Sequence, residues 1–315
     1  MLPLGLGIYL FWYFFSSMSE KSKELFFKAL SEVNYFWIIL SMIFLVLAHY
    51  SRAYRWKYVL EPLGYETNSM NRFYAVLIGY MVNLTIPRAG EASRVVMIGR
   101  SDRVPFTAGI GTIISERVID MISLALITII TFVIGQKDFL RIKALIETNF
   151  GGTKETQSNL IWIFLGLGMI CLLLLLIKKI RKRIFKIIGE LFQSSLSIFK
   201  TKNPGGYIFH SLIIWLCYIV SFMLPFYAFE STENLPMSCV LLAFIAGTVG
   251  ISLTNGGVGS YPLLVGLVVG FFLVDKPAEE ANAIGNALGL IIWSTQTFLV
   301  VVLGLISWWL LPVKK

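Results

Sequence analysis

Long apolar stretches alternate with polar connections along most of this sequence, and the pattern predicts a bundle of membrane-spanning helices. A helix needs about 20 mainly apolar residues to cross a hydrocarbon core roughly 30 Å thick. Several stretches near this length have aromatic or cationic residues at their edges, as membrane spans do. We predict about six full transmembrane helices, at residues 2–16, 35–50, 105–135, 159–177, 207–229 and 281–311.

Two further apolar stretches are interrupted, and each predicts a re-entrant hairpin. Residues 73–86 stop at Pro87 and are followed by the polar residues 88–103, whereas residues 236–253 stop at a glycine-rich turn that runs from residue 254 to 262. A short helix, a Pro or Gly break and a return to the same side require an irregular backbone. Such backbone is tolerated at membrane depth only inside protein or beside a cavity.

A span, a broken hairpin and a long span that contains polar residues follow one another twice, at residues 35–135 and 207–311. Residues 136–206 link the two halves. The basic run within residues 178–202 predicts a cytoplasmic loop by the positive-inside rule. When the sides are assigned from that loop, both termini are cytoplasmic and the two halves have opposite orientations. We therefore expect residues 1–315 to form one polytopic all-α domain of the inner (cytoplasmic) cell membrane, with the inverted repeat found in many transporters.

Between the spans, the extramembrane segments are short. Residues 19–34 mix charges with apolar residues at helical spacing, which predicts a short helix lying at the membrane interface. The basic residues of 178–202 lie beside an amphipathic pattern, and we expect them to contact anionic lipids.

Composition supports the membrane assignment and excludes several functions. The chain is 57% hydrophobic and 14% charged, whereas soluble proteins average about 25% charged residues. Its net charge of +9 comes from basic residues between apolar spans, so we expect no nucleic-acid partner. The three cysteines lie inside apolar segments and the two histidines are far apart, so we expect no metal and no cofactor.

Six ionisable residues lie beside or inside apolar runs, where an unpaired charge costs at least a few kcal/mol. They are Arg88, Glu91, Arg94, Glu116, Arg117 and Asp120. Helical spacing would place Arg88, Glu91 and Arg94 on one helix face, and Glu116 and Asp120 together on another. One interpretation is therefore that each cluster pairs internally and only locks two helices together. We favour the other, in which surplus positive charge at Arg88 and Arg94 faces an anionic head group, because Arg binds phosphate through a planar fork of donors.

Three motifs carry a family resemblance: N-x-x-x-P-R-x-G-E-x-x-R at residues 83–94, E-R-x-x-D at 116–120 and N-G-G-V-G at 255–259. In this order they resemble the membrane domain of the lysylphosphatidylglycerol synthase/flippase family, without its soluble aminoacyl-transfer domain. The resemblance implies movement of aminoacylated, glycosylated or prenyl-linked lipids between leaflets. It also implies that substrate is bound by Asn83, Arg88, Glu91, Arg94, Glu116, Arg117, Asp120, Asn255, Gly256, Gly257 and Gly259.

The leading hypothesis is a lipid translocase rather than an enzyme, with no catalytic residue. Arg88 and Arg94 would hold the phosphate of an anionic, aminoacylated or polyprenyl-linked lipid, and the neighbouring carboxylates would orient the arginines or meet a cationic head group. The first alternative is a membrane-embedded head-group or glycosyl transferase that uses a carboxylate as general base. The second is a non-catalytic partner of a separate lipid synthase. Self-association into a homo-oligomer is compatible with all three.

Overall fold

The structure is a computed structural model that describes Tyr9, Trp12, Ser16 and residues 19–86, 89–138 and 203–312. Within these residues the chain is helical and contains no strand, so the predicted all-α membrane fold is confirmed. The predicted span 159–177 and the basic segment 178–202 lie outside the described residues, as does almost all of the predicted span 2–16.

Four helices of the described ranges are long and apolar enough to cross a membrane. They are α3 (Tyr35–Leu60), α6 (Phe106–Ile134), α10 (Pro204–Met223) and α13 (Ala278–Leu310), with the 3₁₀ segments η1 (Glu61–Leu63) and η2 (Leu224–Ala228) extending α3 and α10. Three of them match their predicted spans closely. The prediction for α3 was too short, because the helix continues past residue 50 with Arg52 and Arg55 buried in the protein interior.

Both predicted hairpins form as pairs of helices separated by a short break. The first consists of α4 (Ser69–Thr85) and α5 (Ala89–Asp102), and the second of α11 (Met237–Leu253), the 3₁₀ turn η3 (Asn255–Gly257) and α12 (Ser260–Phe272). The first pair packs closely because Gly90 has no side chain, and a Cβ there would collide with the carbonyl oxygen of Gly79.

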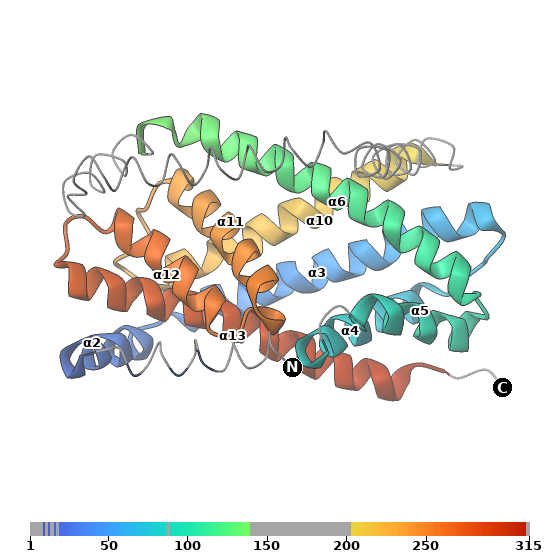
Figure 1. Cartoon of the computed structure of the whole chain (residues 1–315), viewed down its shortest axis with the longest axis horizontal. Coiled ribbons are helices and arrows are strands. Elements are labelled where there is room, and N and C mark those ends of the chain that lie inside the picture. The colour runs from blue at the N-terminus through green and yellow to red at the C-terminus, as the bar shows by residue number, and fades with distance from the viewer. Residues whose placement is uncertain are drawn as a thin grey trace, which may run out of the picture.

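Helices α3 and α10 lie side by side and run in opposite directions. At one end the backbone N–H of Asn34 donates to the carbonyl of Ala228, at 3.0 Å. Further along, the Ser51 hydroxyl donates to the carbonyl of His210, at 3.3 Å. Since residue numbers fall along α10 as they rise along α3, the two helices are antiparallel (Figure 1).

The two hairpins approach from opposite ends of the bundle, and their tips meet near its middle (Figure 1). A Cβ on Gly256, at the tip of the second hairpin, would lie 2.8 Å from the side chain of Leu84, at the tip of the first. Helix α13 runs beneath both tips, where the indole N–H of Trp293 donates to the carbonyl of Gly256 at 2.8 Å. The order of long helix, hairpin and long helix therefore occurs twice along the described residues.

The predicted interfacial segment forms α2 (Glu20–Ser31), which packs against α13. Ser19 caps its N-terminus by accepting from the backbone N–H of Ser22, at 3.0 Å. The hydroxyl of Ser22 then donates to Glu279 in the first turn of α13, at 2.9 Å. Polar contacts thus fix α2 to the start of the last helix.

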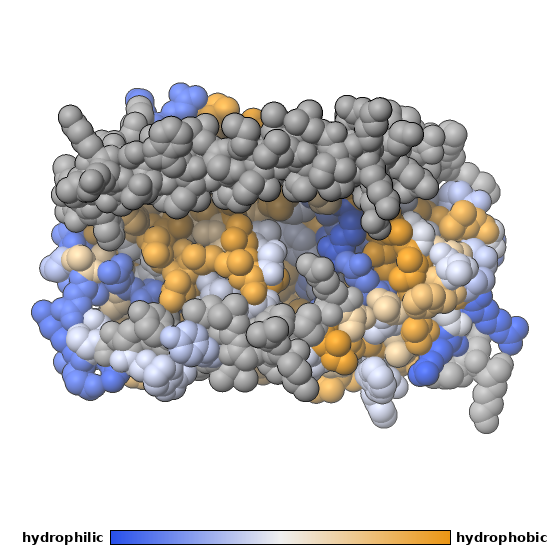
Figure 2. All heavy atoms as spheres, in the orientation of Figure 1, coloured by the Kyte–Doolittle hydropathy of each residue, from blue (hydrophilic) through white to orange (hydrophobic). Residues whose placement is uncertain are grey.

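The outer surface of the bundle is largely apolar, as expected where lipid replaces water. On α6, for example, Met121, Ile129 and Phe132 are each more than half exposed. In the view of Figure 1, two hydrophobic regions of the described surface have hydrophilic atoms between them (Figure 2). The buried side chains of the interior include Trp56, Phe222 and Phe226.

Candidate functional site

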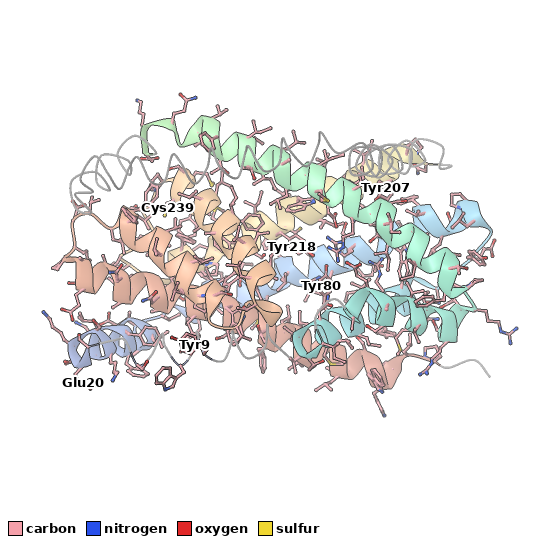
Figure 3. All side chains as sticks on the ribbon, viewed as in Figure 1. Tyr9, Glu20, Tyr80, Tyr207, Tyr218 and Cys239 are labelled. Atoms are coloured by element: carbon pink, nitrogen blue, oxygen red, sulfur yellow. The ribbon has the colours of Figure 1, made fainter. Side chains whose placement is uncertain are left out.

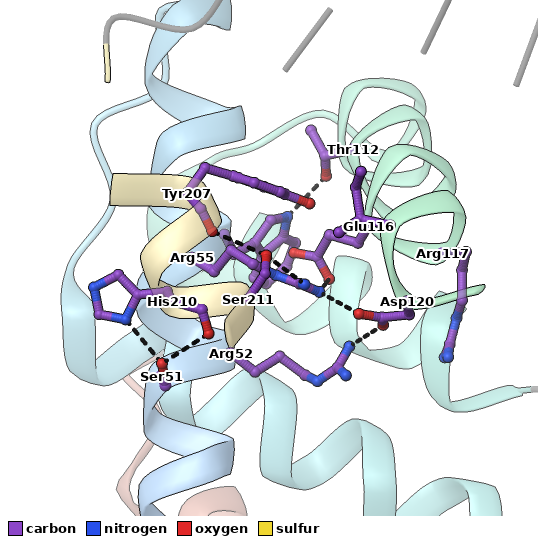
Figure 4. A network of polar contacts seen from close by, with 12 residues as sticks. Ser51, Arg52, Arg55, Thr112, Glu116, Arg117, Asp120, Tyr207, His210 and Ser211 are labelled. Atoms are coloured by element: carbon purple, nitrogen blue, oxygen red, sulfur yellow. Dashed lines mark hydrogen bonds and ion pairs between the residues drawn. The ribbon is translucent and has the colours of Figure 1, made fainter. Parts of the chain in front are cut away.

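Five charged side chains from three helices form one connected group in the interior of the bundle. They are Arg52 and Arg55 of α3, Arg94 of α5, and Glu116 and Asp120 of α6, and at most 9% of any of these side chains is exposed. We call this group the buried charge cluster (Figure 4). Charges buried at this depth are stable only when they are paired and hydrogen-bonded.

Each carboxylate of the cluster is held by two arginines. Asp120 accepts from Arg52 at 2.7 Å and from Arg55 at 3.0 Å. Glu116 accepts from both terminal nitrogens of Arg94, at 2.9 and 3.0 Å, and also lies 3.9 Å from Arg55. Because Arg55 touches both carboxylates, it connects the two halves of the cluster.

Helix geometry brings these side chains together. Arg52 and Arg55 are three residues apart on α3, and Glu116 and Asp120 are four apart on α6, so each pair projects from one face of its helix. The break before α5 allows the second arm of the first hairpin to return beside α6 and to place Arg94 opposite Glu116.

Aromatic and hydroxyl side chains complete the surroundings of the arginines. The guanidinium carbon of Arg94 lies 3.8 Å from the ring centre of Trp56, and that of Arg55 lies 5.3 Å from the ring centre of Tyr207. The negative faces of these rings attract the cations. Arg55 also donates to the hydroxyl of Ser211, at 3.1 Å, which links the cluster to α10.

One further ion pair extends the charges toward the surface. Arg117 of α6 pairs with Glu91 of α5, and their side chains are 48% and 39% exposed. Arg117 follows Glu116 directly, and Glu91 precedes Arg94 by about one helical turn, so this exposed pair adjoins the buried Arg94–Glu116 pair. The charges therefore continue from the bundle interior to an accessible position.

The structure corrects the idea that the charges pair within each motif. Helix α5 does not pair Glu91 with Arg94; both bind residues of α6 instead. The shared face of Glu116 and Asp120 is confirmed, since Arg55 reaches both. Pairing across helices is favoured because carboxylates and arginines on facing helices can meet end to end. Arg88 lies outside the described residues.

Arg52 and Arg55 were missed by the sequence analysis, because it ended the predicted span at residue 50. A signal was present in the sequence. Both residues follow an apolar run at helical spacing, and apolar Trp56 and Leu60 continue the pattern beyond them. A helix that remains apolar on one side while carrying two arginines on another is typical of a span with buried functional charges.

The remaining residues of the predicted site lie at the two hairpin tips. The side-chain oxygen of Asn83 accepts from the backbone N–H of Gly90 at 2.8 Å and so closes the first tip. Gly256, Gly257 and Gly259 have φ angles of 64°, 76° and 73°, which glycine adopts without steric cost. The side chain of Asn255 lies outside the described part of the chain.

The two histidines lie at different positions along α3 and α10. His210 accepts from or donates to the hydroxyl of Ser51 at 2.8 Å, whereas the ring of His49 lies 4.7 Å from that of Tyr80. Among the described residues, no group of three or more His, Cys, Asp and Glu side chains could hold a metal ion.

Comparison with known proteins places the chain among membrane proteins. The family model for the lysylphosphatidylglycerol synthase TM region matches residues 1–304. A UPF0104 membrane protein of Methanocaldococcus jannaschii is 25% identical over 292 residues, covering 82% of this chain and 80% of that protein. No solved structure matches the chain.

Proposed function

We propose that this chain, which belongs to the family of the lysylphosphatidylglycerol synthase TM region, is a translocase that moves an anionic lipid between membrane leaflets. Family membership and the membrane-spanning helices indicate a lipid-related function in the membrane. The substrate class that we propose is an aminoacylated or polyprenyl-linked lipid with a phosphate in its head group.

The observation that carries this proposal is the continuous array of charges from the exposed Arg117–Glu91 pair to the buried charge cluster. Charged residues inside membrane spans are expensive and usually mark a substrate pathway. An exposed ion pair contributes only about 0–1 kcal/mol, so a lipid phosphate can replace Glu91 as the partner of Arg117 at low cost. Arg88, three residues before Glu91, is the second arginine that we propose for phosphate binding.

The arrangement of the two hairpins supports transport rather than a static role. We propose that residues 35–135 and 207–311 are inverted repeats, and that the contact between Leu84 and Gly256 opens and closes as access alternates between leaflets. The lipid chains would remain in the bilayer while the head group passes the hairpin tips. In this proposal the protein resides in the inner membrane with both termini in the cytoplasm.

A transferase would need a carboxylate that is available to accept a proton. The oxygens of Glu116 and Asp120 already accept hydrogen bonds from buried arginines, so neither carboxylate is free to approach a substrate proton. Among the carboxylates of the motifs, Glu91 is therefore the better candidate for such a role. Measuring head-group turnover with the purified protein would distinguish this alternative, and no turnover is expected.

Leaflet movement of fluorescent phosphatidylglycerol in proteoliposomes tests the translocase directly. We expect Arg117→Gln to slow movement by about ten-fold or more, because one hydrogen bond to a charged group contributes roughly 1.5–3 kcal/mol. Arg88→Lys should slow it comparably, since lysine lacks the planar fork. Arg100→Gln is the matched control, because Arg100 is exposed near the other end of α5, and it should move lipid at the wild-type rate.

Monodispersity has to be verified for each variant by size-exclusion chromatography before its rate is interpreted. The proposal fails if folded Arg117→Gln and Arg88→Lys proteins both move every anionic lipid tested at the wild-type rate. A folded wild-type protein that moves no lipid, but increases the output of a lipid synthase in the same vesicles, would support the role of a synthase partner instead.

A further inference from the structure

We propose that the buried charge cluster binds a monovalent anion at the interface of α3 and α10. The cluster contains three guanidinium groups and two carboxylates. Arginine is protonated at any pH that a protein experiences, and both carboxylates are bound by arginines, so the cluster carries one surplus positive charge. A single negative charge would neutralise it.

The surplus charge is costly where it lies. Arg52 is 5% exposed and Arg55 is fully buried, and an uncompensated buried charge destabilises a protein by several kcal/mol. Among the ion pairs of the described residues, no third carboxylate joins the cluster. The aromatic rings over Arg55 and Arg94 attract these cations only weakly by comparison with a full negative charge.

The polar atoms that lack a protein partner indicate the charge of the ligand. Within the described ranges, buried side-chain atoms without a hydrogen-bond partner include the Nε atoms of Arg52, Arg55 and Arg94, the Tyr207 hydroxyl and Nε1 of Trp215. The arginine and tryptophan nitrogens can only donate. A ligand that satisfies them has to accept hydrogen bonds, which fits an anion and excludes a metal cation.

Three more polar side chains lie on the other side of Arg52. The guanidinium carbon of Arg52 is 6.0 Å from the ring centre of Tyr218, whose hydroxyl lies 3.2 Å from that of Tyr80. His49, one helical turn before Arg52, is 3% exposed, and neither of its ring nitrogens has a partner among the described residues. Tyr80 and Tyr218 lie near the centre of the molecule (Figure 3), so donors from α3, α4 and α10 converge there.

The ligand is therefore a group with one negative charge and several acceptor positions. A small inorganic anion such as chloride or dihydrogen phosphate has this chemistry, and so does the phosphodiester of a lipid head group. This site differs from the exposed position that we propose for the transported phosphate at Arg117. Anion binding can be measured without transport, so it stands or fails independently of the translocase proposal.

Titration calorimetry on the full chain in a neutral detergent gives the dissociation constant for each anion. Sodium gluconate, whose anion is bulky, keeps the ionic strength constant while chloride or dihydrogen phosphate is added. A short-chain phosphatidylglycerol and the matching phosphatidylcholine form the lipid arm. The tryptophan fluorescence of the chain, which has eight tryptophans, reports the unfolding temperature in parallel, and anion binding should raise it.

Two charge variants should change anion affinity in opposite directions. Arg52→Gln removes the surplus positive charge while Arg55 still holds Asp120, so we expect affinity to fall about ten-fold or more, as for the loss of one charged hydrogen bond. Asp120→Asn adds a further surplus charge, so affinity should rise. The control is Lys57→Gln, which removes a positive charge from the same helix at a more exposed position, paired with Glu61, and should leave affinity within about two-fold of wild type.

Binding of chloride or dihydrogen phosphate supports a free-anion site, and binding of phosphatidylglycerol alone assigns the site to a head group. The proposal is overturned if none of these ligands binds, or if Arg52→Gln and Asp120→Asn leave the affinity unchanged or move it in the same direction. Should either charge variant fail to fold, Tyr207→Phe and Tyr218→Phe keep all charges and each remove one hydroxyl. Weaker anion binding by both phenylalanine variants is then expected, and wild-type affinity in both contradicts the site.

Discussion

Arg94 and Glu116 join α5 to α6 through a two-point ion pair, in which both terminal nitrogens of the arginine donate to the carboxylate, at 2.9 and 3.0 Å. Both side chains are buried, and the guanidinium also lies over Trp56. This pair therefore attaches the second arm of the first hairpin to the span that follows it in sequence, and it fixes the position of the hairpin in the bundle.

Glu116→Gln should destabilise the protein by about 3–5 kcal/mol, because it leaves a buried arginine without its partner. The measurement is reversible unfolding in mixed detergent micelles. Replacing both residues by apolar ones, Arg94→Met with Glu116→Leu, removes the stranded charge and should cost less than the single change. A double variant that is less stable than either single variant would contradict the assigned pair.

Arg117 should be energetically coupled to Glu91 but not to Asp120. The structure pairs Arg117 with Glu91 at the surface, whereas Asp120 binds Arg52 and Arg55. Double-mutant cycles for unfolding should give at most about 1 kcal/mol for the exposed pair and simple additivity for Arg117 with Asp120. Strong coupling in the Arg117–Asp120 cycle would show that Asp120 has a different partner from those assigned.

Apolar length and Pro or Gly breaks predicted most of the fold. Both hairpins and the spans at α6, α10 and α13 were expected, because membrane insertion depends on the local sequence: a long apolar run crosses, and a broken one does not. The spacing of Glu116 and Asp120 also predicted correctly that they share a face. Local pattern was sufficient for these features because each depends only on residues that are close together in the sequence.

The partners of the charges could not be predicted in the same way. Arg52 and Asp120 are far apart in sequence, and only the packing of α3 against α6 brings their side chains together. Hydropathy also misled at α3, since arginine lowers the apolar score whether it faces water or a buried carboxylate. A helix end was therefore predicted near residue 50, where the structure has a continuous helix to Leu60.

Gly256→Ala should destabilise the contact between the hairpin tips. Gly256 has φ of +64°, and a Cβ there would lie 2.8 Å from Leu84. Alanine would add about 1–2 kcal/mol of backbone strain and the cost of moving Leu84. The control is Gly111→Ala in α6, where a Cβ meets nothing within 4 Å, and this change should stabilise the helix by roughly 0.5–1 kcal/mol. Equal effects of the two substitutions on the unfolding free energy would show that the tips are not in close contact.

Single cysteines at Glu233 and Glu66 should report opposite sides of the membrane. Glu233 lies between α10 and α11, and Glu66 between α3 and α4, and both residues are exposed. Because α3 and α10 are antiparallel, these connections lie at opposite ends of the bundle, and the predicted orientation places Glu233 outside and Glu66 in the cytoplasm. With the native cysteines replaced by alanine, an impermeant maleimide added to intact cells should label Glu233→Cys, and Glu66→Cys only after the membrane is opened.

Labelling of Glu66→Cys in sealed cells, with Glu233→Cys protected, would reverse the orientation while leaving the antiparallel fold intact. Labelling of both from the same side would contradict the fold itself, because α3 would then not span the membrane between α2 and α4.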